Sequence, residues 1–154
     1  MTTRGIECLK VAGVRFEILP YRHEAIGAKP VAEALHLPEE IVIKTIVFQA
    51  DDRSFLLALM GGDGSVSEKK LARASGHKRV SPATPRDAER VTGYQIGGIG
   101  PFGLKQPFPV FLDEVTAQRD QIVINAGARG TMTRLSTADL IRLTGATVAD
   151  IRIE

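Results

Sequence analysis

The chain has 154 residues, of which 44% are hydrophobic, enough to build the core of one compact domain, so we expect one domain over residues 1–154. Lysine and arginine total 20 against 18 for aspartate and glutamate, so the net charge of +2 does not by itself favour a nucleic-acid partner, and the single cysteine excludes an intrachain disulfide. No apolar run reaches transmembrane length, and Glu7 and Lys10 stand where a signal peptide would be apolar, which predicts a cytoplasmic protein without a membrane partner.

The first half of the chain is typical of alternating short helices and strands followed by a hairpin. Apolar residues at helical spacing precede Gly13, a natural helix stop, and a second short helix ends before Pro38. A β-branched run follows and predicts a central strand, and the polar residues 50–54 have the length of a hairpin turn. The expected elements are helices over residues 3–12 and 30–37 and strands over residues 15–19, 41–49 and 55–60.

The second half continues with helices whose ends are marked by capping residues. Ser67 and Ser136 are plausible N-caps, Pro85 suits a first helical position, and Gly76 and Gly93 suit helix ends. The expected elements are helices over residues 68–75, 85–93 and 136–143 and strands over residues 109–112, 121–125, 131–135 and 148–153. Because strands and helices are mixed without strict alternation, we expect an α+β fold with a mixed, mostly antiparallel, barrel-like sheet and surrounding helices.

Lys44 interrupts a strand that is apolar on both faces. A buried ammonium is costly unless it meets an anion, a cavity or a substrate, so this position favours a lysine that projects into a pocket. The alternative is a lysine whose stem packs on the sheet while its ammonium reaches water. The strand alone does not separate these two interpretations.

Residues 97–103 form a glycine-rich segment, GGIGPFG. From Gly98 to Gly103 it matches the dinucleotide-binding pattern G-x-G-x-x-G, but Pro101 and Pro107 prevent the helix that this pattern needs. Backbone without side chains can instead approach a substrate and bind a carbonyl oxygen or a phosphate through its N–H groups. A plain structural turn is the alternative.

A basic cluster lies between residues 69 and 90, where it predicts either a phosphate-binding surface or an ordinary solvated helix surface. Its members are Lys69, Lys70, Arg73, Lys78, Arg79, Arg86 and Arg90. The three histidines, His23, His36 and His77, lack metal-ligand spacing, so we expect no metal and no cofactor.

Four segments together resemble the YbaK/EbsC family of aminoacyl-tRNA deacylases, which are free-standing relatives of the editing domain of bacterial prolyl-tRNA synthetases. They are Tyr21-x-His23, residues 42–45 around Lys44, the glycine-rich residues 97–103 and residues 125–130. The resemblance covers nearly the whole chain. It implies the fold of the prolyl-tRNA synthetase-associated domain and the charged 3′ end of a tRNA as substrate, with an aminoacyl-tRNA synthetase as a further partner.

The resemblance also implies roles for individual residues. Lys44, Gly98 and Gly100 would be catalytic, and tRNA would lie on the basic cluster. Substrate-binding residues would be Tyr21, His23, Thr45, Ile99, Pro101 and Asn125, and tRNA-binding residues would be Lys69, Lys70, Arg73, Lys78 and Arg79. The expected activity is hydrolysis of a mischarged tRNA, tRNA-Pro or another tRNA that carries a small wrong amino acid.

Three positions depart from the pattern of the cysteine-clearing members, which usually have Ser in place of Gly100, a Ser near Asn125 and an Asp near Met132. These departures favour alanine, serine, threonine or a small non-protein amino acid as the target. Two alternatives stay open: a non-catalytic tRNA-binding module of the same fold, and an enzyme that uses Lys44 to form a Schiff base with a small carbonyl compound.

Overall fold

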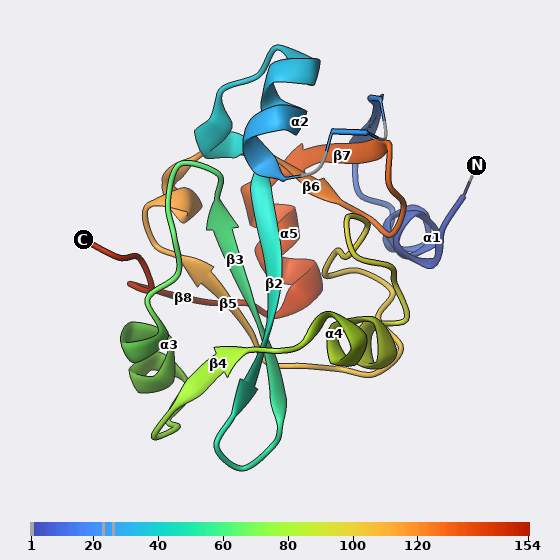
Figure 1. The fold of residues 1–154 in the computed structure, drawn as a ribbon. Helices are drawn as coiled ribbons and strands as arrows, with labels where there is room; N and C mark the ends of the chain where they lie inside the picture. Colours follow the sequence, from blue (N-terminus) through green and yellow to red (C-terminus); the bar gives the residue numbers. More distant parts are fainter. Residues whose placement is uncertain (1, 23, 26) are drawn as a thin grey trace.

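The computed structural model describes residues 2–22, 24–25 and 27–154, and in this part of the chain five α-helices surround eight strands in two sheets (Figure 1). The helices are α1 (Arg4–Ala12), α2 (Ala28–Leu35), α3 (Glu68–Ser75), α4 (Pro85–Thr92) and α5 (Thr137–Thr144), with short 3-10 turns η1 (Glu39–Ile41) and η2 (Thr116–Gln118). The strands are β1 (Phe16–Pro20), β2 (Ile43–Ala50), β3 (Phe55–Gly61), β4 (Val80–Pro82), β5 (Val110–Asp113), β6 (Gln121–Asn125), β7 (Thr131–Ser136) and β8 (Thr147–Ala149).

The larger sheet has the strand order β4-β2-β3-β5-β8. β2 and β3 form the predicted antiparallel hairpin, in which Lys44 pairs with Met60, and the Ala50 N–H closes the turn by donating to the Ser54 carbonyl at 2.8 Å. β4 extends the sheet beside β2 in antiparallel orientation, while β5 and β8 extend it beyond β3 in parallel. In Figure 1 α2 therefore lies near the start of β2, and α3, β4 and the hairpin turn lie near its other end.

The smaller sheet has β7 between β1 and β6, and both pairs are antiparallel. A parallel bridge between Val42 and Val123 joins it to the start of β2. The two sheets meet at this point without closing into a barrel. The predicted α+β class and the mostly antiparallel pairing are confirmed. Where the prediction has a barrel-like sheet, the structure has an open pair of sheets.

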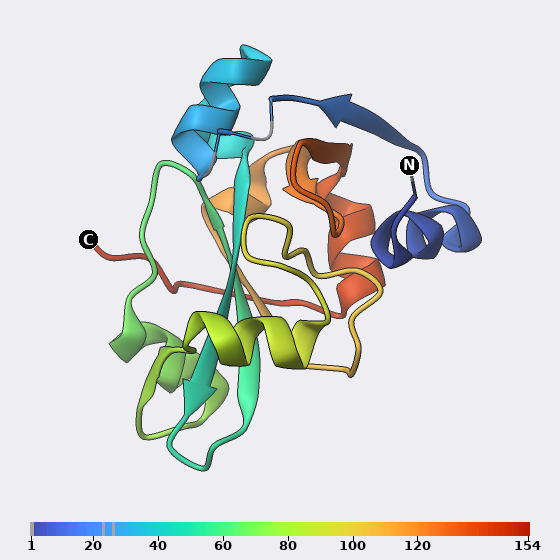
Figure 2. The ribbon, with the colours of Figure 1, turned by 45° about the vertical axis from the view of Figure 1, so that its right-hand side comes forward.

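β3 is buried on both faces. Because successive side chains of a strand point to opposite sides, its residues alternate between two cores. Leu57 and Leu59 belong to the core that α1, α4 and α5 cover, whereas Leu56, Ala58 and Met60 belong to a second core under α3. The two sides of the sheet can be followed by turning from Figure 1 to Figure 2. The core thus makes the β2–β3 hairpin a rigid support for whatever lies at its ends.

The predicted caps are confirmed. The side chains of Ser67 and Ser136 accept hydrogen bonds from the Lys70 and Asp139 amides, and α3 and α4 end at Gly76 and Gly93 in the left-handed conformation. These local sequence patterns therefore place the helices within a few residues.

Four elements differ from the prediction by two residues or more. β2 begins at Ile43 instead of Ile41, which belongs to the turn η1. α2 begins at Ala28, two residues before the predicted start, and β4 was not predicted because a three-residue edge strand with a proline has no period to detect. β8 ends at Ala149, and only Arg152 beyond it forms a bridge, with Val66. Among the described residues, no helix has the length and apolar character needed to cross a membrane.

Candidate active site

A pocket of about 250 Å³ lies where the two sheets meet, beside the start of β2. It brings together five of the predicted site residues, and most of its other wall is apolar. The predicted residues that line it are Tyr21, Lys44, Thr45, Ile99 and Asn125, and among the apolar ones are Val31, Val42, Ile96 and Met132. Gly98, Gly100 and Pro101 belong to the adjoining loop but do not line the pocket, and His23 lies outside the described residues.

Lys44 is half-buried in the wall of this pocket, on β2. Its ammonium donates a hydrogen bond to the carbonyl of Gly64, in the loop that follows β3. Burial lowers the pKa of Lys44, and the negative charges of Glu39 and Asp63 oppose this effect. Lys44 therefore lines the pocket with donor capacity left over when it is charged, because an ammonium has three N–H groups and Gly64 accepts one of them.

Thr45, the next residue, has the most unusual hydroxyl of the site. Its Oγ1 is buried and has no hydrogen-bond partner among the described residues. A buried hydroxyl without a partner costs about 1–3 kcal/mol, so its retention on a pocket wall is typical of a group that a ligand satisfies. Sequence reasoning placed Thr45 at the site only through its neighbour.

The glycine-rich loop packs tightly on the end of β6. A Cβ at position 100 would fall 1.8 Å from the carbonyl oxygen of Asn125, so only glycine fits without a backbone shift. The Gly98 N–H already donates to the Gln95 carbonyl at 2.8 Å. Of the loop amides considered for substrate binding, those of Ile99 and Gly100 have no backbone acceptor within the described part of the chain.

Asn125 holds this loop in place. Its Nδ2 donates to the carbonyls of Gly97 at 3.2 Å and Ala128 at 3.1 Å, and its Oδ1 accepts from the amides of Gly127 at 2.8 Å and Ala128 at 3.1 Å. Both N–H groups of Nδ2 and both acceptor sites of Oδ1 are therefore used within the protein. Asn125 therefore lines the pocket as a scaffold that joins two loops, a role that its sequence position did not indicate.

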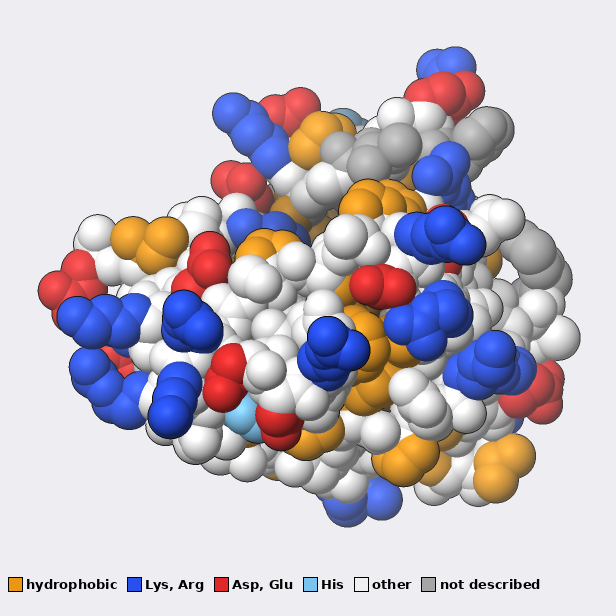
Figure 3. Space-filling model, turned by 60° about the horizontal axis from the view of Figure 1, so that its bottom comes forward, with side chains coloured by type: hydrophobic (Ala, Val, Ile, Leu, Met, Phe, Trp, Pro, Cys, Tyr) orange, Lys and Arg blue, Asp and Glu red, His pale blue; other side chains and the backbone are white. Residues whose placement is uncertain are grey.

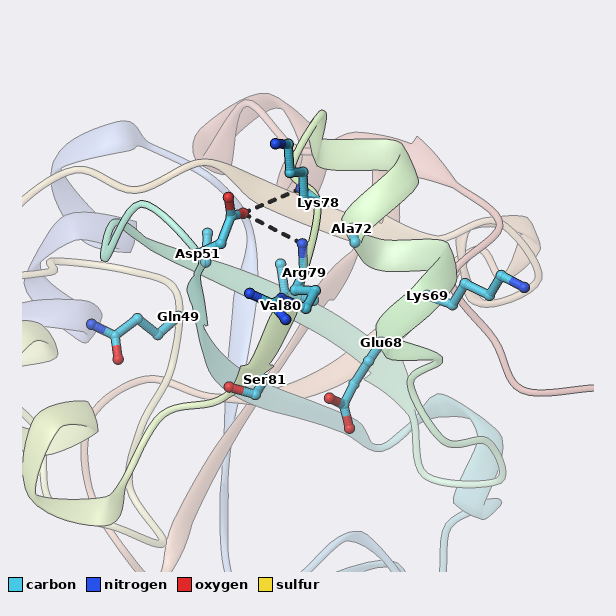
Figure 4. Close-up of a pocket in the computed structure, with 10 residues that line it drawn as sticks. Gln49, Asp51, Glu68, Lys69, Ala72, Lys78, Arg79, Val80 and Ser81 are labelled. Carbon is cyan, nitrogen blue, oxygen red and sulfur yellow. Dashed lines mark hydrogen bonds between the residues drawn. The ribbon is translucent and has the colours of Figure 1, made fainter.

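Three of the five predicted tRNA-binding residues lie beside the opposite end of β2, which is roughly 20 Å from Lys44 along the strand at about 3.3 Å per residue. Lys69, Lys78 and Arg79 line a hollow of about 530 Å³ between α3 and β4. Lysine and arginine side chains gather on this face of the molecule, with acidic side chains between them (Figure 3). The Asp51 carboxylate accepts from the Lys78 amide at 3.2 Å and the Arg79 amide at 3.4 Å, and the bond from Arg79 is the main reason that the pKa of Asp51 is lowered (Figure 4).

Two other members of the basic cluster lie outside the hollow. Lys70 forms ion pairs with Asp150 at 3.0 Å and with Glu154 at 3.3 Å, and the hydrogen bond that Lys70 donates to Asp150 raises the pKa of Lys70. Arg73 is exposed on α3 and does not line the hollow. Within the described part of the chain, no group of three or more His, Cys, Asp or Glu side chains is placed to hold a metal ion.

An α+β domain with a lysine in a small, mostly apolar pocket is typical of domains that bind or convert a small chemical group. The family model of the aminoacyl-tRNA editing domain matches residues 24–143, most of the chain and all of the pocket except Tyr21. The chain therefore belongs to the aminoacyl-tRNA editing domain family, which hydrolyses mischarged aminoacyl-tRNA. The family expected from the four motifs is confirmed.

Individual relatives agree with this assignment. The Enterococcus faecalis protein named "Putative Cys-tRNA(Pro)/Cys-tRNA(Cys) deacylase EbsC" is 33% identical over 148 residues, which cover 96% of this chain and 90% of that protein. The proline–tRNA ligase of Streptococcus thermophilus is 33% identical over 112 residues, which cover 71% of this chain and 18% of the ligase. A solved structure described as "a putative trans-editing enzyme for prolyl tRNA synthetase" superposes with a TM-score of 0.89 at 25% identity, over 100% of this chain and 99% of that one.

Proposed function

We propose that the pocket around Lys44 hydrolyses the ester that joins a small, wrong amino acid to the terminal ribose of a tRNA. The observation that carries this proposal is the half-buried lysine on the wall of a pocket of about 250 Å³, in a chain of the editing-domain family. A cavity of this size suits an amino acid with a short side chain. Larger side chains are excluded by volume, whereas near-isosteres differ by only about 1–3 kcal/mol per methylene.

The chemistry asks little of the protein, because an aminoacyl ester is already activated. Hydrolysis needs a positioned water and donors for the oxyanion that develops on the carbonyl oxygen. We assign the donor role to the amide of Ile99, which lines the pocket, since the Gly98 amide is already bonded to Gln95 and Gly100 does not line the pocket. Lys44 holds the ribose-phosphate end with the N–H groups that Gly64 does not use. The ribose 2′-hydroxyl or the substrate amine takes the proton of the attacking water.

Thr45 narrows the substrate class. Its unpartnered Oγ1 is one polar group of the wall that can bond a hydroxyl or thiol on the substrate, whereas the side chain of Asn125 is fully used. Serine and threonine thus fit the pocket chemistry, and alanine and cysteine fit its volume. The relatives among proline–tRNA ligases support tRNA-Pro as the carrier.

The tRNA body is proposed to lie across the face that carries Lys69, Lys78 and Arg79. Contacts of lysine and arginine with phosphates supply affinity without reading sequence. Lys70 and Arg73, which were predicted with them, lie at the side of this hollow, and Lys70 is held by two carboxylates.

Release of the amino acid from a panel of charged tRNAs tests the proposal. The panel holds tRNA-Pro charged with alanine, serine, threonine, cysteine, 2-aminobutyrate and proline, and the reaction is followed by labelled amino acid. We expect turnover of at least one small substrate and none of prolyl-tRNA. If every member of the panel is bound but left intact, the protein is a binding module and the hydrolase assignment is wrong.

A further inference from the structure

The loop between β3 and α3 supplies the acceptor of Lys44, and it is unusually tightly packed. A Cβ on Gly61 would fall 2.7 Å from the Glu40 carbonyl oxygen, and one on Gly62 would fall 2.7 Å from the Glu39 carbonyl oxygen. Glycine at these positions therefore lets the loop lie against η1, next to the pocket. The carbonyl of Gly64 then faces the Lys44 ammonium.

One arginine, from the end of the chain, holds this loop from the other side. The Arg152 Nη1 donates to Asp63 Oδ2 at 3.1 Å, and its Nη2 donates to Asp63 Oδ1 at 3.4 Å and to Thr116 Oγ1 at 3.3 Å. The same Thr116 hydroxyl accepts from the Gly61 amide at 3.0 Å. The guanidinium also covers Gly64 so closely that a Cβ there would fall 2.7 Å from Arg152 Cζ.

Arg152 is itself anchored. Its Nε donates to Asp113 Oδ2 at 3.0 Å, and the Asp113 side chain is 0% exposed at the end of β5. The backbone on either side is paired with the segment after the loop, because Ser67 N–H donates to the Ile151 carbonyl at 2.7 Å and Ile153 N–H to the Ser65 carbonyl at 2.9 Å. The guanidinium thus has a fixed position relative to the sheet that carries Lys44.

We propose that Arg152 is a positioning residue, which clamps the loop of residues 61–64 against β2 and thereby fixes the Gly64 carbonyl that orients the Lys44 ammonium. This inference rests on the proposed function of Lys44. Arg152 does not line the pocket, so it acts on the substrate through the loop and the lysine. Loss of the clamp leaves Lys44 in place but free to turn from its productive orientation.

The clamp also sets the charge around Lys44. Glu39 on η1 and Asp63 in the loop favour the charged ammonium, whereas Arg152 disfavours it. Asp63→Asn therefore lowers the pKa of Lys44, and Arg152→Gln raises it. Both shifts follow from the removed charges alone, so the position of the loop has to be read from its own hydrogen exchange.

The test compares wild type with Asp63→Asn, Arg152→Gln and Arg152→Lys. The Asp63 side chain is 36% exposed, and Asp63→Asn leaves the buried Arg152–Asp113 pair intact. Asp63→Asn therefore keeps the test possible if Arg152→Gln does not fold. A matched pair of controls is Asp139→Asn and Arg142→Gln, which break an exposed 3.1 Å ion pair on α5. Three quantities are measured: kcat/KM with the substrate found by the panel, hydrogen exchange of the amides of residues 61–66, and the Lys44 pKa from the Cε NMR shift, assigned with Lys44→Met.

We expect Asp63→Asn and Arg152→Gln to lower kcat/KM on the order of tenfold or more, to speed exchange in the loop and to move the Lys44 pKa in opposite directions. Arg152→Lys keeps the charge but not the planar fork, so its kcat/KM should lie between those of wild type and Arg152→Gln, with a Lys44 titration like wild type. The controls should match wild type. Unchanged loop exchange in Asp63→Asn and Arg152→Gln would overturn the clamp, whatever the Lys44 titration shows. If wild type hydrolyses no ester, the proposed function fails, and the exchange and NMR readouts still decide on Arg152.

Discussion

At the scale of single residues, the sequence revealed Lys44 because a charge in a two-faced apolar strand is an exception to its surroundings. The sequence could not reveal its acceptor, because the Gly64 carbonyl belongs to a loop 20 residues away in the chain. The lack of a partner for Thr45 Oγ1 is likewise a property of the packed site and has no local pattern. Charge in an apolar context can thus be found from sequence, while its hydrogen-bond partners cannot.

Thr45→Val tests whether the unpartnered hydroxyl is kept for the substrate. Valine has nearly the same shape, so the variant should be more stable by about 1 kcal/mol because an unsatisfied buried hydroxyl is removed. Turnover of seryl- or threonyl-tRNA should fall more than turnover of alanyl-tRNA. Urea unfolding and the panel assay measure the two effects.

Thr133→Val is the matched control for this substitution. Thr133 is fully buried on β7, and its hydroxyl donates to the Ile124 carbonyl at 2.8 Å. The same change should therefore destabilise the protein by about 1 kcal/mol at this position. Equal losses of stability in both variants would show that the Thr45 hydroxyl is bonded in the folded protein.

At the scale of elements, the helices and the β2–β3 hairpin follow from local patterns, namely caps, glycine stops and β-branched runs. The pairing of β5 and β8 and the short β4 do not, because parallel and edge pairings depend on contacts distant in sequence. The same holds for the two loops beside the pocket. The sequence indicated residues 97–103 and 125–130 separately. That the Asn125 side chain joins the two loops is seen only in the structure.

Asn125→Ala tests the joint between these loops. The variant loses four hydrogen bonds at a buried site and should be less stable by about 3 kcal/mol, with faster hydrogen exchange in both loops. Gln49→Ala is the control, because the Gln49 amide makes one bond, to the Arg53 carbonyl at 3.3 Å, and should cost less than about 0.5 kcal/mol. Wild-type stability in Asn125→Ala would contradict the scaffold role.

At the scale of the whole molecule, the distribution of charged side chains over the surface is more informative than the net charge. The predicted basic cluster is continuous in sequence, but the fold divides it between the hollow of Lys69, Lys78 and Arg79 and the C-terminal carboxylates that bind Lys70. Asp150 and Glu154 follow Lys70 by about 80 residues, so no local pattern could show this pairing.

The salt dependence of tRNA binding tests the role of the hollow. The combined variant Lys69→Gln, Lys78→Gln and Arg79→Gln should weaken binding and reduce the slope of log affinity against log salt by about 2 to 3, close to one per lost phosphate contact. A triple variant with the same change of net charge, on exposed residues elsewhere, is the control: Lys10→Gln, Arg15→Gln and Arg119→Gln. Equal slopes for the two triple variants would show that tRNA does not bind to this face.

The most direct test of the central claim compares single-turnover release of the amino acid by wild type and by Lys44→Met. The folded-state pKa of Lys44 is lowered, so stability rises as pH increases through the interval between the folded and unfolded pKa values, and the buried charge is a cost at neutral pH. Methionine removes that charge at similar length, so the variant should unfold at the same temperature as wild type or above it. We expect its hydrolysis rate to fall on the order of a hundredfold or more, because the substrate end is no longer held. Hydrolysis at the wild-type rate by folded Lys44→Met would contradict the assignment of the active site to this lysine.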